Sequence, residues 1–172
     1  PERVSIISEG IQLAPLASLE DVQKYTEPTV LALGAIRGMK QTAHVVQAFE
    51  IAKKQVPRLH LTLAGASEDY YAHRVTRSVI RSPHTNSIRM LGRVTATARL
   101  RLMQKSHVLV SASLKEGWGL TVTEAASQGT PAVVYNADGL RDSVRDKQTG
   151  LIARENTPQA LAESIEALFK DP

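Results

Sequence analysis

Short apolar runs that alternate with segments of helical periodicity constrain the fold of this chain most strongly. The runs occupy residues 30–33, 59–64, 88–91, 108–111 and 131–135. Most are continuously apolar rather than alternating, which is typical of strands buried on both faces of a parallel sheet. The segments between them repeat apolar residues at helical spacing. The sequence therefore predicts an α/β domain with a doubly wound, Rossmann-like parallel sheet.

The remaining elements follow from caps and turn residues. Helices are expected over 43–55, over 68–80, from a cap at Thr95 or Thr97 to 105, from about 119 to 128, and from a cap at 156–158 to 169. A helical turn is expected over 139–144 and a last extended piece over 149–152. Residues 4–7 are expected to form a short strand, and 14–29 an irregular connection. We expect one domain over 30–172, with 1–29 as a linker and first strand packed on it. The start without Met suggests a domain from a longer protein.

The segment 116–124 is the part of the chain best suited to chemistry. Gly117 and Gly119 permit positive φ and close approach of a ligand to the backbone. The amides from Gly119 onward would be the unpaired donors at the positive end of a helix, which suit phosphate. The flanking carboxylates of Glu116 and Glu124 suit hydroxyl groups, so the pattern favours a nucleotide joined to a sugar. The competing interpretation is a tight turn with Trp118 as core filler and two surface carboxylates.

The charge distribution is uneven, although the net charge is only +4. Residues 70–115 contain no Asp or Glu but carry Arg74, Arg77, Arg81, Arg89, Arg93, Arg99, Arg101, Lys105 and Lys115. A solvated helix face is one interpretation, and attraction for an anionic ligand or an anionic membrane surface is another. Nucleic-acid binding is disfavoured because aromatic residues make up only 4% of the chain.

Several classes of site are excluded by composition. Cys is absent, so the chain has no disulfide and no thiolate metal site, which is compatible with a reducing compartment. The chain contains no run of about 18 apolar residues, so no membrane-spanning helix is predicted. The His residues show no ligand spacing, and the turn over 34–40 lacks the second Gly and the Ser or Thr of a P-loop. We expect a cytoplasmic protein, either free or peripheral at the inner face of a membrane.

The 116–124 segment also resembles the E-x7-E signature of retaining glycosyltransferases of family four, which have the GT-B fold. Further motifs resemble that family in the same order along the chain: the linker 3–11, the glycine-rich turn 33–40, the strand ends 63–65 and 91–94, the loop 138–142 and the late turn 149–151. The resemblance implies the C-terminal, nucleotide-sugar-binding domain of a two-domain enzyme. Its partner would be an N-terminal acceptor domain of the same polypeptide.

By this resemblance, Lys40 and Glu116 are the catalytic groups, and Lys40 neutralises the diphosphate as it leaves. Glu124 hydrogen-bonds the nucleotide ribose, and the backbone near Arg93 and Val94 borders the base. The expected donor-binding set is Gly34, Arg37, Gly65, Arg93, Val94, Gly117, Trp118, Gly119, Leu120 and Glu124. Enzymes of this kind typically need no metal, so no metal or other cofactor is expected.

Two positions depart from the family pattern. Ala35 stands where the family usually has an arginine that pairs with the diphosphate. Asp138 stands where a glycine is usual, and it is expected to add a negative charge near the donor site. Arg37 either reaches into the site in place of the missing arginine or is a solvated loop residue. These departures keep a second hypothesis open, a non-catalytic relative that serves assembly or regulation. An epimerase or phosphorylase of GT-B-like fold is a third, and the E-x7-E match argues against it only by analogy.

Overall fold

A computed structural model describes residues 10–20, 22–67 and 69–170 of the chain. Its centre is a six-stranded sheet of order β3-β2-β1-β4-β5-β6, in which every neighbouring pair is parallel. The strands are β1 (Thr29–Leu33), β2 (His60–Ala64), β3 (Ile88–Met90), β4 (Val108–Ser111), β5 (Ala132–Val134) and β6 (Gly150–Ile152). The prediction of a doubly wound parallel α/β fold is confirmed.

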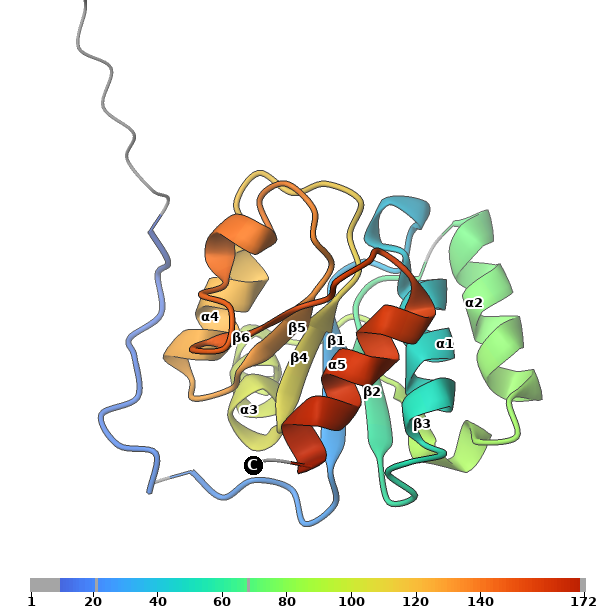
Figure 1. The fold of residues 1–172 in the computed structure, drawn as a ribbon, viewed down its shortest axis with the longest axis horizontal. Helices are drawn as coiled ribbons and strands as arrows, with labels where there is room; N and C mark the ends of the chain where they lie inside the picture. The colour runs from blue at the N-terminus through green and yellow to red at the C-terminus, as the bar shows by residue number, and fades with distance from the viewer. Residues whose placement is uncertain (1–9, 21, 68, 171–172) are drawn as a thin grey trace, which may run out of the picture.

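Five α-helices and three short 3₁₀ helices accompany the sheet within the described residues. They are η1 (Gly38–Lys40), α1 (Thr42–Ala52), α2 (Tyr70–Arg81), η2 (Thr85–Ser87), α3 (Ala96–Lys105), α4 (Leu120–Ser127), η3 (Arg141–Ser143) and α5 (Pro158–Lys170). Figure 1 shows α1, α2 and α5 on one side of the sheet and α3 and α4 on the other. The placement of α1 to α4 follows from right-handed crossovers, because the strand order reverses direction between β3 and β4. The helix α5 follows the last strand and packs against α1.

The helix starts are fixed by short polar side chains. Asp69 accepts a hydrogen bond from the Ala72 amide at 2.7 Å at the start of α2. Thr95, rather than Thr97, caps α3, since its hydroxyl accepts from the Ala98 amide at 3.2 Å. Such caps satisfy amides that have no acceptor inside the helix, and each is typically worth about 1 kcal/mol.

The core explains why the strand segments are apolar without alternation. Val30 and Leu31 are neighbours on β1, their side chains point to opposite faces of the sheet, and both are 0% exposed. Helices cover both faces, so each face is a buried face. Phe49 of α1 is also fully buried, and Tyr135, which follows β5, is 1% exposed. Burial of each such side chain is worth roughly 1.5–3 kcal/mol.

The connection before the sheet contacts the C-terminal ends of α3 and α4. The amide of Leu16 donates to the Ser127 carbonyl at 3.0 Å. Lys24 Nζ donates to the carbonyls of Ser106 and Gly129 at 2.8 and 3.0 Å. Both carbonyls lie just beyond a helix end, where cations are favoured. The expected strand over residues 4–7 lies outside the described residues.

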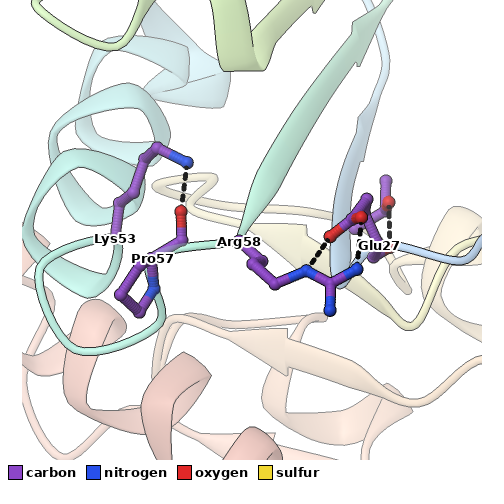
Figure 2. Close-up of polar contacts among 5 residues, drawn as sticks. Glu27, Lys53, Pro57 and Arg58 are labelled. Atoms are coloured by element: carbon purple, nitrogen blue, oxygen red, sulfur yellow. Dashed lines mark hydrogen bonds and ion pairs between the residues drawn. The ribbon is translucent and has the colours of Figure 1, made fainter.

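The two edges of the sheet differ in character. At the edge where β1 and β2 begin, the amino edge, Arg58 Nε and Nη2 donate to the two carboxylate oxygens of Glu27 at 2.6 and 2.5 Å. Figure 2 shows this contact, and beside it the Lys53 ammonium donating to the Pro57 carbonyl at 2.9 Å. The opposite edge, where the strands end, is the carboxyl edge. Ligands of open α/β sheets bind outside that edge.

In the described part of the chain, no helix combines the length and the apolar character that crossing a membrane requires.

Candidate functional site at the carboxyl edge

The turns that follow β1, β2 and β3 are joined backbone to backbone. The Gly34 amide donates to the Ala64 carbonyl at 2.9 Å, and the Gly65 amide donates to the Gly92 carbonyl at 2.8 Å. A Cβ atom at Gly65 would lie 1.8 Å from the Gly34 carbonyl oxygen, so only glycine fits there. The predicted strand-end turns thus meet at one edge, as the parallel topology requires.

The loop between β4 and α4 is packed in the same way against the loop after β5. The Glu116 amide donates to the Asp138 carbonyl at 3.0 Å. Gly139 has φ 77°, and a Cβ there would lie 2.2 Å from the Glu116 carbonyl oxygen. Gly119 has φ 75° and directly precedes α4, and a Cβ there would lie 2.7 Å from Ser143 Oγ. The path of this loop is therefore set by close backbone packing.

A pocket of about 290 Å³ opens between this loop, the start of α4 and the end of β1. Its walls include Leu33, Lys40, Ser111, Glu116, Gly117, Trp118, Gly119, Leu120, Thr121 and Leu140. The amides of Leu120 and Thr121 belong to the first turn of α4 and have no acceptor within that helix. They lie at the positive end of the helix dipole, so this wall of the pocket suits an anion such as a phosphate group.

Lys40 and Glu116 form an ion pair at the pocket wall, although they are far apart in the sequence. Lys40 Nζ lies 2.5 Å from Glu116 Oε1, and the side chains are 28% and 20% exposed. Burial raises the pKa of Glu116, but hydrogen bonds from Lys40 and Ser113 and the charges of Lys40 and Arg37 outweigh it. The net pKa therefore lies below the usual value, and the carboxylate is charged at neutral pH.

Within the ranges that the structure describes, no arginine lines the pocket in place of the one that the family usually has at the position of Ala35. Arg37 is exposed and is absent from the lining residues, although its charge helps to lower the pKa of Glu116. Gly34 lines a small neighbouring cavity together with Ala35 and Lys40. Lys40 is thus the one cation among the described residues that lines the 290 Å³ pocket.

Glu124 has a partner that the sequence did not reveal. Arg99 of α3 donates to both of its oxygens, one contact being Nη1 to Oε1 at 3.1 Å. The side chain of Glu124 is 14% exposed and that of Arg99 is 37% exposed. A single arginine in a basic helix gives no pattern that names its partner, so only the packing of α3 against α4 could identify Arg99.

The remaining predicted residues lie outside the pocket wall. Arg93 is exposed after β3, and Val94 is half-buried and packs against the core. Gly65 does not line the pocket, but its close backbone contact with Gly34 holds the turns after β1 and β2 together. The carboxylate of Asp138, expected to add negative charge near the donor, is paired with Arg141 at 2.5 Å and is 63% exposed. Its charge is therefore balanced at the surface.

The described residues contain no group of three or more His, Asp or Glu side chains that could hold a metal ion. His44 instead contacts the hydroxyl of Tyr135 through Nδ1 at 2.9 Å. Burial raises the pKa of Tyr135 to about 12, so this hydroxyl is neutral at physiological pH. The pair links α1 to the segment after β5.

Comparison with proteins of known sequence or structure gives consistent results. The chain is 29% identical over 140 residues to the poly(glycerol-phosphate) alpha-glucosyltransferase of Bacillus subtilis (strain 168), covering 81% of this chain and 20% of that protein. Anabaena Alr3699/HepE, solved in complex with UDP and glucose, matches with a TM-score of 0.76 and 21% identity over 84% of this chain and 39% of that one. The chain thus spans well under half the length of either relative.

A third match concerns a domain solved by itself. The C-terminal domain of a glycosyl transferase group 1 family protein (LpcC) from Francisella tularensis matches with a TM-score of 0.75 and 18% identity, covering 92% of this chain and 85% of that one. The two solved structures share the fold of this chain. Residues 19–172 match the family model described as glycosyl transferases group 1. Since that match covers most of the chain and the fold agrees with it, the chain belongs to the group 1 glycosyl transferase family.

Proposed function

We propose that the protein containing this chain transfers a sugar from a nucleotide-sugar donor to an acceptor hydroxyl, with retention at the anomeric carbon, and that this chain binds the donor. The observation that carries the proposal is the pocket at the carboxyl edge, where the amide end of α4 meets the Lys40–Glu116 ion pair. The family match supports this reaction class, and the UDP bound by the Anabaena relative supports this class of donor.

In this proposal the diphosphate binds against the amides of Leu120 and Thr121 and beside Lys40. Negative charge grows on the diphosphate as the sugar leaves, and preorganised donors at that position lower the barrier. Lys40 has three N–H donors and Glu116 accepts one of them, so the others are available to phosphate oxygens. The Glu116 carboxylate accepts hydrogen bonds from hydroxyl groups of the sugar. The residues supply these donors themselves, so we propose that no metal ion or cofactor takes part.

The acceptor site is proposed to lie on an N-terminal domain of the same cytoplasmic polypeptide, with residues 1–29 as the connection between the two domains. This chain by itself then binds nucleotide weakly and does not turn over. Calorimetric titration of UDP, GDP and ADP tests the binding function. We expect one of them to bind and Lys40→Met to weaken it. Absence of binding by all three, with the fold intact in circular dichroism, would contradict the proposal.

A second candidate is a non-catalytic relative, and Ala35 is the observation that favours it. The pocket wall holds one cation where the family resemblance implies two, and the lost charge-assisted contact lowers transition-state stabilisation by a few kcal/mol (roughly, from deletions at comparable sites). A screen of nucleotide-sugars against the full-length protein, measured as released nucleoside diphosphate, separates the candidates. Release that depends on an added acceptor supports the enzyme, and nucleotide binding without any release supports the relative.

We also propose that the protein associates with an anionic membrane surface through α2. Arg74, Arg77 and Arg81 recur at helical spacing on the exposed face of α2, next to Tyr70, whose side chain is 79% exposed. None of the three arginines has a carboxylate partner among the described residues. They line a surface hollow of about 540 Å³. Exposed guanidinium groups of this kind attract anionic headgroups.

Sedimentation with vesicles tests the membrane proposal. Binding should rise with the phosphatidylserine or phosphatidylglycerol content, fall with salt, and be reduced in Arg74→Gln/Arg77→Gln. Binding that depends on neither lipid charge nor salt would rule the proposal out.

A further inference from the structure

Arg99 and Glu124 make a two-bond contact between α3 and α4 beside the pocket. Arg99 Nη1 donates to Glu124 Oε1 at 3.1 Å, and Nη2 donates to Oε2. The carboxylate is the more enclosed partner, with 14% of its side chain exposed. A planar pair of donors fixes the orientation of a carboxylate, which a single donor does not do. Glu124 is therefore held in one orientation before any ligand binds.

Glu124 is not among the residues that line the pocket, but it lies one turn further along α4 than residues that do. Leu120 and Thr121 line the pocket, and residues three and four positions further along a helix lie on the same face. Each carboxylate oxygen offers two acceptor positions, so the Arg99 contact leaves one on each oxygen. Two acceptors at a fixed separation match two neighbouring hydroxyl donors. The 2′- and 3′-hydroxyls of a ribose are such a pair, and the family resemblance already implies that Glu124 hydrogen-bonds the ribose; the structure adds Arg99 as the residue that holds Glu124.

We infer that Arg99 is a positioning residue that presents both oxygens of Glu124 to the ribose hydroxyls and thereby selects ribonucleotides over 2′-deoxyribonucleotides. This inference rests on the proposed function, because it requires a nucleoside diphosphate in the pocket. Arg99 also balances the Glu124 charge, which would otherwise repel the diphosphate. A purely structural ion pair predicts something different, a small effect on stability and none on ligand selectivity.

The test compares binding of UDP, GDP and ADP with that of their 2′-deoxy forms, by calorimetry on the 172-residue chain. The wild type should favour the ribonucleotide by about tenfold or more, the effect of one hydrogen bond to a charged group. Arg99→Met should bring the ratio close to one, because the released carboxylate can turn away. Arg99→Lys should restore only part of it, since an ammonium group lacks the two-donor geometry.

Arg58→Met is the matched control. It removes an arginine that makes the same two-bond contact with Glu27 at the amino edge, away from the pocket, and it should leave the ratio unchanged. If Arg99→Met does not fold, Arg99→Lys and the double variant Arg99→Lys/Glu124→Gln carry the test. Glu124→Gln should lower the ratio of ribonucleotide to 2′-deoxyribonucleotide affinity in the wild type. The same substitution should lower it less in the Arg99→Lys background, because both residues act through one contact.

Two results would overturn the inference. A folded Arg99→Met or Arg99→Lys variant with the wild-type ratio overturns it and leaves the proposed function intact. A wild-type chain that binds no ribonucleotide removes both together. The ratio separates these cases, because it is measured only where nucleotide binding has been established.

Discussion

The two edges of the sheet carry the same arginine–glutamate contact in two different settings. At the amino edge, the Arg58 and Glu27 side chains are 70% and 37% exposed (Figure 2). At the carboxyl edge, the Arg99 and Glu124 side chains are 37% and 14% exposed. The residue types and the number of hydrogen bonds are the same, so pairing alone does not distinguish a functional site. The two contacts differ in their exposure to solvent and in their surroundings: the Arg99–Glu124 contact is more enclosed, and Glu124 lies in α4, whose N-terminus borders the pocket.

The backbone follows the same division. At the carboxyl edge, glycines allow the main chain of one turn to touch the main chain of the next, as between Gly65 and Gly34. At the amino edge, side chains close the loops, as where Lys53 donates to the carbonyls of Pro57 and Leu59. Main-chain contact leaves amides and carbonyls in fixed positions near the pocket.

Gly65→Ala should have the largest effect on stability. Its Cβ would lie 1.8 Å from the Gly34 carbonyl oxygen, so the turns after β1 and β2 must separate. Overpacking of this kind costs roughly 1–3 kcal/mol. Chemical denaturation measures it, and Gly117→Ala is the control because a Cβ there has no neighbour within 4 Å. Equal midpoints for the two variants would show that the close approach has no energetic weight.

Lys40→Met should have the largest effect on ligand binding. It removes the cation at the pocket wall and leaves the Glu116 carboxylate without its ion-pair partner, so repulsion between this carboxylate and the diphosphate is added to the lost contact. We expect an affinity loss for nucleoside diphosphate of about tenfold to a hundredfold, the range for hydrogen bonds to charged groups. Calorimetry measures this, with Lys53→Met at the amino edge as the control. An unchanged dissociation constant in Lys40→Met would place the diphosphate elsewhere.

Acid should destabilise the chain through both edges. The pKa of Glu116 lies below its usual value, and so does that of Glu27, because of its hydrogen bond from Arg58. Each carboxylate therefore contributes stability that is present above about pH 4.5, the unfolded value, and is lost as the pH falls through the folded pKa. Thermal melts from pH 7 to pH 3 should show a smaller decline in Glu116→Gln than in wild type. A parallel decline would assign the acid sensitivity to other groups.

Arg58→Met should have the smallest effect of the four. Its contact with Glu27 is open to solvent, so screening removes most of its energy. We expect a melting temperature and a nucleotide affinity that match the wild type within error. Loss of nucleotide binding in this variant would mean that the two edges are coupled, which would weaken the use of Arg58 as a control for Arg99.

Much of the fold and part of the site followed from local sequence. The strands were expected within one or two residues of their observed limits, because burial on both faces leaves continuous apolar runs. Strand β1 begins at Thr29, one residue before its expected start, since Thr29 is paired with His60 in the sheet. The start of α4 was also predictable as a site suited to phosphate, since a glycine directly before a helix, here Gly119, can be recognised from the local sequence.

The partners of the charged residues could not be predicted in the same way. Lys40 meets Glu116 only because β1 and β4 are neighbours, and Arg99 meets Glu124 only because α3 and α4 pack on one face. The expectation that Asp138 adds charge to the donor site omitted Arg141, which pairs with it. A motif names residue types at fixed spacing, but the depth and partner of each charge depend on segments far along the chain.

By itself, then, the sequence determined the elements, the parallel sheet and the family, and it predicted the segment 116–124 as the centre of the candidate site. Those properties depend on periodicity, turn residues and spacing, which act over a few residues. Only the tertiary structure decided that Lys40 is the cation at the pocket wall, that Glu124 is held by Arg99 and that Gly65 touches Gly34. Electrostatic energy and close packing depend on distance in space and on exclusion of water, and both are set only when the chain has folded.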